Sequence, residues 1–340
     1  TVAGKIAAAI KGIKNYPIMM TGGHPAALPL RTMEENGIDF VCDREGPATI
    51  FNTFQALKAK VAGLSVVPSL WWFDKTANQI RAPKMVEPLI TNLDGEMPGI
   101  AWDQLAVGKY RSHNWHSFDH IDQRGPYAAI HTSLGCPWKC HFCMVNSPYG
   151  KPAYRMWSPK VVIREIDYLA REQGVVNIKF VDEMFVLNKA HVLGLCKLLA
   201  SREYKVNIWA YARVDTVQDE FLGALKQAGV NWLCLGIESA SSFVRDGALK
   251  KYGNAEIIDT VRRIQAAGIY VIGNYIFGLP DDTKERMKET LDLALELNCE
   301  YANFYSAMAY PGSALYRDAV AQGRRLPEKW EDYSQHGYGT

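Results

Sequence analysis

The sequence lacks the features that mark several common classes of protein. Its 340 residues carry a net charge of only +2, so charge gives no reason to expect nucleic acid or a membrane surface as a partner. The longest apolar run, Val61–Phe73, contains a proline and two serines and is too short to span a bilayer. The first residues do not form a secretory signal. These absences argue against a secreted, a membrane-spanning or a nucleic-acid-binding protein.

Cysteine is present, but it does not indicate a disulfide framework. The seven cysteines are an odd number, and 48% hydrophobic with 22% charged residues is the balance of a globular protein that builds a core without cross-links. Cys42, Cys196, Cys234 and Cys299 lie in apolar runs and are expected to be ordinary buried thiols. We expect a cytoplasmic protein, because thiols persist in a reducing compartment.

The other three cysteines, Cys136, Cys140 and Cys143, lie in one short loop with the spacing C-x3-C-x2-C. Thiolates this close in sequence can converge on one metal centre. A [4Fe–4S] cluster normally takes four thiolates, so three leave one iron open, and an open position distinguishes catalytic from structural metal sites. A zinc site would need a fourth ligand such as His131 or His141. Zinc ligands usually come as two separated pairs, however, and no second C-x2-C occurs.

From Gly125 onward the sequence repeats a short apolar strand, a loop and an amphipathic helix. Nearly continuous apolar strands are typical of a parallel sheet that is buried on both faces. Six such units are fewer than the eight that close a TIM barrel. The predicted fold is therefore α/β, an open, TIM-like (β/α)6 partial barrel with right-handed crossovers. The predicted strands are Tyr127–Thr132, Asn177–Val181, Asn207–Tyr211, Trp232–Gly236, Tyr270–Phe277 and Ala302–Ala307, and the predicted helices include Val161–Glu172, Ala190–Ala200, Ala255–Ala267 and Thr283–Leu297.

Before these units the sequence contains part of a second α/β domain. Apolar strands at Pro17–Met20 and Asp39–Cys42 are each followed by a turn and a helix, the second helix being Thr49–Ala62. The turns contain Gly22-Gly23 and Glu45-Gly46, and glycines after a strand allow a flat or phosphate-bearing ligand to approach the backbone. We predict the second half of a Rossmann-like sheet, with a docking module that binds nothing as the alternative.

The predicted domains are residues 1–62 as the C-terminal part of the Rossmann-like domain, 63–124 as a connector, 125–325 as the barrel and 326–340 as the start of a C-terminal segment. Residue 1 is not methionine and the last residues are loop-like, so we expect a fragment of a longer polypeptide. The connector contains Trp71-Trp72-Phe73 and a histidine-rich patch, Ser112–His116. These residues either line a substrate cavity or pack an extended linker.

The cysteine spacing, with Phe142 just before the last cysteine, resembles the signature of the radical S-adenosylmethionine (SAM) family, and the strand order resembles its partial-barrel core. The resemblance implies a [4Fe–4S] cluster on Cys136, Cys140 and Cys143, with Phe142 as a nearby SAM contact. The open iron would bind the amino and carboxylate groups of SAM. The reduced cluster would then pass one electron to the sulfonium and release a 5′-deoxyadenosyl radical.

Residues at the strand ends are candidates for further SAM contacts, because chemistry in parallel α/β folds gathers at the carboxyl ends of the strands. Many members of the family hold the SAM amino group with a Gly-Gly-Glu run after the second strand. This chain lacks that run, and its Val181–Phe185 resembles the variant of cobalamin-linked members, so by resemblance Glu183 takes this role and Glu238 accepts hydrogen bonds from the ribose. A solvated acidic turn or a charge at a helix start is the alternative for Asp182 and Glu183. Arg213 pairs with the SAM carboxylate or forms a structural ion pair with Asp215. Gly273 inside a strand indicates close approach of the adenine or of another backbone.

A half-domain of this kind followed by a connector and a radical SAM core resembles the cobalamin-binding (class B) radical SAM enzymes. By this resemblance, Gly22, Gly23, His24, Glu45 and Gly46 line the corrin of cobalamin. No D-x-H-x-x-G motif occurs, so His24 is not assigned as a cobalt ligand.

The resemblance implies a cobalamin-dependent enzyme that methylates an unactivated carbon through a 5′-deoxyadenosyl radical. Its cofactors would be a [4Fe–4S] cluster, SAM and cobalamin, its substrate a small or lipid-like molecule, and its electron donor an external flavodoxin or ferredoxin. The alternatives are a radical SAM cyclase or rearrangement enzyme, a methylthiotransferase, and a non-catalytic Fe–S or corrin-binding module. A methylthiotransferase would need more cysteines before the main loop than Cys42 alone. The sequence does not identify the substrate.

Overall fold

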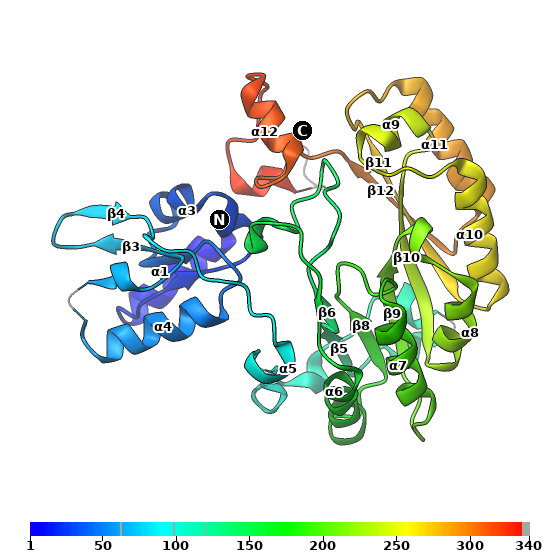
Figure 1. The fold of residues 1–340 in the computed structure, drawn as a ribbon, viewed down its shortest axis with the longest axis horizontal. Helices are drawn as coiled ribbons and strands as arrows, with labels where there is room; N and C mark the ends of the chain where they lie inside the picture. Colours follow the sequence, from blue (N-terminus) through cyan, green and yellow to red (C-terminus); the bar gives the residue numbers. More distant parts are fainter. Residues whose placement is uncertain (62, 98, 119, 335–340) are drawn as a thin grey trace. The chain divides into compact units, whose positions relative to one another are not determined.

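The computed structural model describes residues 1–61, 63–97, 99–118 and 120–334, and it divides into two compact units (Figure 1). The first, which we call the N-terminal unit, comprises Thr1–Thr91, Pro137–Ala153 and Met308–Thr340. The second, the barrel unit, comprises Asn92–Cys136 and Tyr154–Ala307. Ala62, the predicted end of a helix, and residues 335–340 of the predicted C-terminal segment 326–340 lie outside the described residues. These two units do not test the predicted domain boundaries, which therefore remain predictions.

The barrel unit is built on a parallel sheet in which strands that follow each other in the chain also lie side by side. All of its described neighbours pair in the same direction, which confirms the predicted parallel partial barrel. In spatial order the strands are β5 (Tyr127–Ile130), β8 (Asn177–Phe180), β9 (Asn207–Ala212), β10 (Val230–Glu238), β11 (Tyr270–Phe277) and β12 (Tyr301–Ser306).

Most of the described helices between these strands begin at side-chain caps, but the helices Asp219–Gln227 and Asn254–Ala266 have none. Ser158 accepts a hydrogen bond from Val161 N, and Asn188 accepts one from His191 N. The sequence also predicts helix caps at Asn254 and Asp282, and both predictions are wrong. The helix Asn254–Ala266 follows Gly253 without a side-chain cap, and the cap of the helix before the last strand is Thr283, whose hydroxyl accepts from Arg286 N at 3.3 Å. The helices are α6 (Pro159–Glu172), α7 (Lys189–Ala200), α8 (Asp219–Gln227), α9 (Ser242–Gly247), α10 (Asn254–Ala266) and α11 (Lys284–Leu297).

The two faces of the six-stranded sheet differ in character, since successive side chains of a strand point to opposite faces. One face joins the main hydrophobic core with the helices; Ile178, Phe180 and Leu233 are fully buried there. The other, which we call the inner face, carries a separate aromatic cluster centred on Trp209 and Trp232. The strands therefore pack against the helices on one side and carry a second, smaller buried cluster on the other.

The N-terminal unit contains a four-stranded mixed sheet in the order β1-β2-β3-β4. The strands are β1 (Met19–Met20), β2 (Phe40–Cys42), β3 (Leu70–Asp74) and β4 (Gln79–Arg81), and β1 and β2 are parallel whereas β3 and β4 run antiparallel to their neighbours. Its helices are α1 (Val2–Ile13), α2 (Gly23–Ala27), α3 (Pro29–Asn36), α4 (Pro47–Lys58) and α12 (Ala314–Ala321). The parallel pair with its following helices is the predicted Rossmann-like half-sheet.

Residues 70–81 differ from the expectation of a connector over residues 63–124, because β3 and β4 extend the N-terminal sheet. Leu70 is fully buried while Phe73 is 39% exposed, and the Trp71 indole N–H donates to Asp43 Oδ2 at 2.9 Å. The hairpin reverses at Asn78, whose φ of +49° is a left-handed conformation that asparagine tolerates. The aromatic run Trp71-Trp72-Phe73 thus belongs to an inner strand of the N-terminal sheet, so it packs the sheet rather than an extended linker.

Short elements complete the described residues, in which no helix is long and apolar enough to cross a membrane. They are α5 (Leu93–Glu96), the strands β6 (Ser133–Leu134) and β7 (Arg155–Met156), and the 3-10 turns η1 (Leu64–Val66), η2 (Trp102–Gln104), η3 (Val107–Lys109), η4 (Trp115–Ser117), η5 (Ile121–Gln123), η6 (Ser147–Tyr149), η7 (Val214–Thr216) and η8 (Trp330–Tyr333).

Candidate functional site

The cysteine loop leaves the sheet after β5, and the antiparallel pair β6–β7 closes its base. Cys136 belongs to the barrel unit, and Cys140 and Cys143 belong to the N-terminal unit. All three side chains are half-buried, and none of the seven cysteines forms a disulfide. Cys143 N donates to Cys140 O at 3.0 Å, so the last two cysteines and the half-buried Phe142 lie on one turn.

The part of the chain that the structure describes does not show a preformed metal site. Among the described residues, no three His, Cys, Asp or Glu side chains are close enough to hold a metal ion. The cluster is therefore inferred from its donor set, three thiolates in one loop, which is the ligand type that iron–sulfur clusters require. His141, one of the two histidines considered as a zinc ligand, has another partner, because its Nε2 lies 2.6 Å from Asp318 Oδ2 on α12.

A buried carboxylate, that of Asp182 after β8, fixes the strand end from which the cysteine loop leaves. It accepts hydrogen bonds from Thr132 N at 2.7 Å, Thr132 Oγ1 at 2.6 Å and Ser133 Oγ at 2.5 Å. Burial raises the pKa of Asp182 to about 6, and these hydrogen bonds oppose the shift. Asp182 is completely buried, so it is a structural anchor rather than part of a solvated acidic turn.

Glu183, the next residue, holds the first residues of the cysteine loop. Its Oε2 accepts a hydrogen bond from Gly135 N at 2.9 Å, directly before Cys136. Burial is the main reason why the pKa of Glu183 is raised, while the neighbouring Arg155 lowers it. The carboxylate of Glu183, the predicted contact to the SAM amino group, thus bonds the residue that directly precedes Cys136, a predicted cluster ligand.

Arg213 forms the ion pair with Asp215 that was the structural alternative for it. Its Nε donates to Asp215 Oδ1 at 2.9 Å and its Nη2 donates to Oδ2 at 3.0 Å, which is the two-pronged geometry that arginine forms with carboxylates. The Arg213 side chain is only 6% exposed. The guanidinium is therefore held in one orientation at the carboxyl end of β9.

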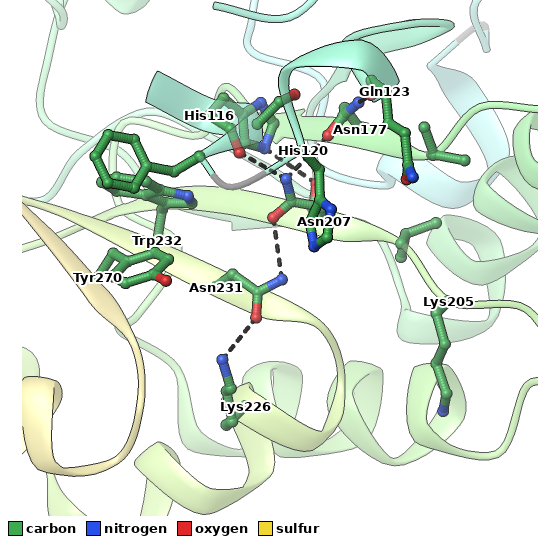
Figure 2. A pocket seen from close by; sticks show the side chains of 14 residues that line it. His116, His120, Gln123, Asn177, Lys205, Asn207, Lys226, Asn231, Trp232 and Tyr270 are labelled. Carbon is green, nitrogen blue, oxygen red and sulfur yellow. Dashed lines mark hydrogen bonds between the residues drawn. The ribbon is translucent and has the colours of Figure 1, made fainter. Parts of the chain in front are cut away.

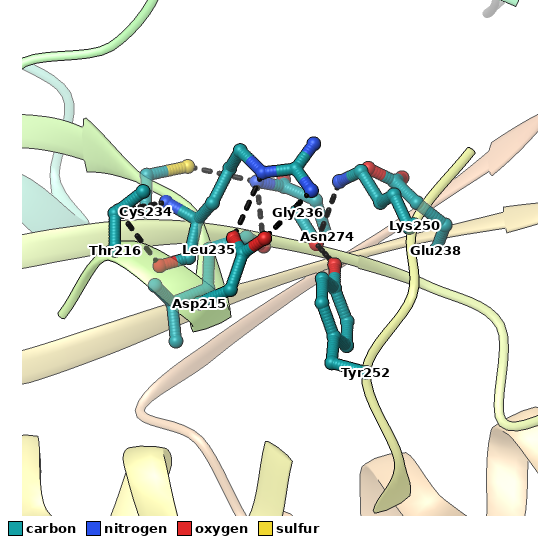
Figure 3. A network of polar contacts seen from close by, with 10 residues as sticks. Asp215, Thr216, Cys234, Leu235, Gly236, Glu238, Lys250, Tyr252 and Asn274 are labelled. Atoms are coloured by element: carbon teal, nitrogen blue, oxygen red, sulfur yellow. Dashed lines mark hydrogen bonds and ion pairs between the residues drawn. The ribbon is translucent and has the colours of Figure 1, made fainter. Parts of the chain in front are cut away.

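Glu238 pairs with a residue that the sequence analysis did not identify, Lys250. The Lys250 ammonium donates to Glu238 Oε1 at 2.5 Å and to the carbonyl of Gly236 at 2.8 Å, and Tyr252 Oη donates to the same carbonyl at 2.7 Å (Figure 3). The Glu238 and Lys250 side chains are 7% and 5% exposed. A buried carboxylate is expensive unless it is paired, and Lys250 provides that pairing.

The backbone of Glu238 is strained. Its φ is +67°, a left-handed conformation that is uncommon outside glycine and clusters at functional sites. The pairing of β10 with β11 also shifts register between Gly236 and Glu238, and such bulges re-aim side chains. A side chain at Gly236 would meet the carboxylate of Glu238 and the amine of Lys250 at 2.6 Å, so glycine leaves room for this ion pair.

Gly273 makes room for a neighbouring side chain on the helix-covered face. A Cβ at this position would lie 2.8 Å from Tyr275 Oη and 2.9 Å from its ring, and Tyr275 is fully buried in the main core. The close approach predicted for Gly273 is thus made by a side chain of its own strand. By strand alternation Gly273 falls on the helix-covered face with Val271 and Tyr275, away from the aromatic cluster of the inner face.

The glycines predicted to line a corrin lie at adjacent strand ends of the N-terminal unit. Gly22 has a φ of +111° and its side-chain position is open, with nothing within 4 Å. Gly46 has a φ of +112°, and a Cβ there would lie 3.9 Å from the Thr21 side chain. The two turns are therefore neighbours, as expected for parallel strands. At Gly23, by contrast, a Cβ would meet Met144 Cε at 2.5 Å.

His24 and Glu45 complete the predicted cobalamin contacts. The His24 ring packs on Trp330 and Tyr333, and burial, with the charge of Arg31, lowers its pKa to about 4. Its Nε2 is buried and has no hydrogen-bond partner among the described residues. It lines a mostly apolar cavity of about 300 Å³. The Glu45 carboxylate accepts a hydrogen bond from Ile90 N at 3.3 Å.

A second cavity, of about 370 Å³, lies in the barrel unit at the amino ends of the strands (Figure 2). Its wall contains a chain of amides in which Asn231 donates to Asn207 at 3.0 Å and Asn207 donates to Asn177 at 2.9 Å. These amides satisfy one another, and the cavity is at the opposite edge of the sheet from the cysteine loop. It is therefore a structural feature rather than part of the candidate site.

The sequence pattern of the Radical SAM superfamily matches residues 130–294. The chain is 32% identical over 322 residues to the uncharacterized methyltransferase PH0819 of Pyrococcus horikoshii, a match that covers 94% of this chain and 67% of that protein. It is 25% identical over 345 residues to the anaerobic magnesium-protoporphyrin IX monomethyl ester cyclase of Cereibacter sphaeroides, covering 98% of this chain and 52% of the cyclase. The chain thus spans between about half and two thirds of these relatives.

Two solved structures share the fold over nearly the whole chain. The radical SAM methyltransferase TsrM from Kitasatospora setae, with cobalamin and a [4Fe–4S] cluster bound, has a TM-score of 0.76 at 20% identity over 96% of this chain and 62% of its own. The cobalamin-dependent SAM radical enzyme OxsB has a TM-score of 0.73 at 17% identity over 98% of this chain and 52% of its own. The predicted combination of a partial barrel with part of a Rossmann-like domain is confirmed.

Proposed function

Since this chain belongs to the radical SAM superfamily, we propose that it is part of a cobalamin-dependent radical SAM enzyme that methylates an unactivated carbon. The observation that carries the proposal is the C-x3-C-x2-C loop at the carboxyl end of the first strand of a parallel six-stranded sheet. A methyltransferase among its relatives, PH0819, supports methyl transfer, and the cobalamin enzymes TsrM and OxsB, which share its fold, support the cofactor.

The thiolates of Cys136, Cys140 and Cys143 fit a [4Fe–4S] cluster with one open iron. When bound, the cluster, SAM and cobalamin supply the electron, the hydrogen-abstracting radical and the methyl group. The chain's own contribution is to hold the cysteine loop through Asp182 and Glu183, whose hydrogen bonds fix Thr132, Ser133 and Gly135 at its base.

Phe142, Glu183, Arg213, Glu238 and Gly273 are the proposed contacts to SAM. Two of these side chains are fixed in the protein without SAM, because Arg213 forms an ion pair with Asp215 and Glu238 forms one with Lys250. Fixed side chains lose less conformational entropy on binding than mobile ones. Gly273 would contribute its backbone, because the space beside its Cα belongs to Tyr275.

Gly22, Gly23, His24, Glu45 and Gly46 are the proposed contacts to cobalamin. The open space at Gly22 and the left-handed backbone of Gly22 and Gly46 fit a ligand that approaches the main chain closely. His24, held neutral by burial, fits an apolar environment beside such a ligand. These residues belong to one sheet edge, as an anchored planar cofactor requires.

The substrate is proposed to be a small or lipid-like molecule, and the electron donor an external flavodoxin or ferredoxin. Thiols without disulfides and an oxygen-sensitive cluster support a reducing cytoplasm as the location. Ring closure is the second candidate reaction, because the cyclase of Cereibacter sphaeroides matches 98% of the chain. Domain limits at residues 124 and 325 are proposed for the full-length protein, whereas β3 and β4 move the end of the Rossmann-like domain beyond the predicted residue 62.

Cobalamin binding tests the proposal. The full-length protein is expected to retain hydroxocobalamin through gel filtration, and Gly23→Leu to weaken retention by about tenfold or more, the equivalent of about 1.4 kcal/mol of overpacking. Because a side chain at residue 23 also displaces Met144 next to Cys143, the double variant Gly23→Leu/Met144→Ala gives that side chain room within the protein. It is expected to lose cobalamin and keep its iron.

Gly12→Leu is the matched control, because the side-chain position of Gly12 on α1 is open. It is expected to retain cobalamin like the unaltered protein. If the unaltered full-length protein retains no cobalamin, or if the double variant retains it fully, the cobalamin part of the proposal fails.

A further inference from the structure

The inner face of the barrel sheet carries an amine, that of Lys179, for which neither the fold nor the proposed cofactor contacts give a role. Lys179 lies on β8 between the fully buried Ile178 and Phe180. These two neighbours point into the helix-covered core, so Lys179 points to the inner face. Its side chain is half-buried, and burial is the main reason why its pKa is lowered.

Aromatic rings hold this amine in place. Lys179 Nζ lies 4.2 Å from the centre of the Trp209 ring and 5.5 Å from that of Tyr211, both on the adjacent β9. The centre of the Trp115 ring lies 5.2 Å from that of Trp209 and 5.3 Å from that of Trp232. Trp115 thus covers the part of the inner face near the amino ends of the strands. The amine therefore lies beside a group of aromatic side chains on the inner face, which we call the aromatic floor. It precedes, along the strands, the carboxyl ends that carry Glu183 and Arg213.

Acceptors for hydrogen bonds are scarce around Lys179. Among the described residues it has no hydrogen bond or ion pair with a carboxylate. The buried indole N–H of Trp209 next to it has no hydrogen-bond partner there either. His131, at the end of β5, has its pKa lowered by burial and by the charge of Lys179. A half-buried ammonium without a counter-ion is costly, and an anionic ligand would remove that cost.

We propose that Lys179 binds an oxyanion, a carboxylate or phosphonate-type group, on a substrate whose flat apolar part lies against the half-buried ring of Tyr211, while the buried Trp209 holds the amine in place. This inference rests on the proposed function and adds the substrate class to it. The arrangement gives two different contacts at the floor of the inner face, a charge and an aromatic surface. The rest of the substrate would extend from this floor toward the strand ends, where the cysteine loop begins.

The test uses a simple aromatic acid and its neutral amide, indole-3-propionate and indole-3-propionamide, titrated into the reconstituted protein and followed by saturation-transfer NMR. The unaltered protein is expected to prefer the acid by about tenfold, as a charge-assisted hydrogen bond provides. Lys179→Met keeps the apolar stem on Trp209 and should abolish the preference. Lys179→Arg, and Lys288→Met at an exposed ion pair on α11, should keep it.

A SAM titration of the same proteins shows whether Lys179 binds the carboxylate of a substrate or that of SAM. If Lys179→Met weakens SAM binding about tenfold and leaves the preference for the acid intact, the amine serves the SAM carboxylate and the inference is wrong. Equal binding of acid and amide to the unaltered protein, or binding of neither, also overturns it. Formation of 5′-deoxyadenosine in the same samples reports separately on the proposed function, so the two failures are distinguishable.

Discussion

Replacing any one of Cys136, Cys140 and Cys143 by alanine is expected to abolish the iron–sulfur cluster. With three thiolates, anaerobic reconstitution of the unaltered protein should give about four irons per chain and the brown absorbance of a [4Fe–4S] cluster. Two thiolates leave two irons open to solvent, so each alanine variant should lose the iron almost completely. Iron and sulfide content after gel filtration measure the effect.

Cys196→Ala and Cys299→Ala are the controls. Burial raises the pKa of Cys196 to about 12 and that of Cys299 to about 11, so both side chains remain protonated and are poor metal ligands. These variants should keep all their iron. Binding of one zinc and no iron by the unaltered protein would show that the loop is a zinc site instead.

Lys250→Met is expected to destabilise the protein by about 3–5 kcal/mol, because it leaves the carboxylate of Glu238 buried without its charged partner. The Lys250 side chain is 5% exposed and bonds Glu238 Oε1 and the carbonyl of Gly236, so methionine can fill its place but cannot satisfy either oxygen. Urea unfolding of the barrel measures the loss.

The double variant Glu238→Gln/Lys250→Met separates the charge from the packing. It removes both charges, and it should recover most of the stability that Lys250→Met loses. Lys288→Met breaks a solvent-exposed ion pair with Asp292 and should cost about 1 kcal/mol at most. A loss no larger for Lys250→Met than for Lys288→Met would contradict the buried ion pair.

The strands and helices of the barrel could be predicted because each carries a local signal. Continuous apolar runs gave all six strands, and Ser158 and Asn188 gave the starts of two helices. The hairpin of β3 and β4 was missed because its run Trp71-Trp72-Phe73 has no polar alternation. Whether such a run forms a strand, packs a linker or lines a cavity depends on tertiary contacts.

The sequence identified which residues lie at the strand ends, but it mostly did not identify the side chains with which they form ion pairs. Asp215 is two residues from Arg213, so their ion pair was a recognisable alternative, and the structure shows it. Lys250 is twelve residues beyond Glu238 in a loop after α9, and no local pattern connects the two. The unassigned amine of Lys179 was likewise hidden inside an apolar strand.

At Gly273 the sequence correctly indicated a close contact but not the residue that makes it. Glycine in a strand indicates that something approaches closely, and the sequence analysis considered a ligand or another backbone. The structure places the ring of Tyr275, two residues along the same strand, in that space. Residues two apart in a strand share a face, so the aromatic residue at that spacing was the available signal.

The central claim, that this chain is a radical SAM enzyme, is tested most directly by SAM cleavage. The anaerobically reconstituted and reduced full-length protein is incubated with SAM, and 5′-deoxyadenosine and methionine are measured by liquid chromatography and mass spectrometry. We expect both products in equal amounts from the unaltered protein and neither from Cys140→Ala. A protein that contains its full complement of iron, binds SAM and forms no 5′-deoxyadenosine would contradict the assignment.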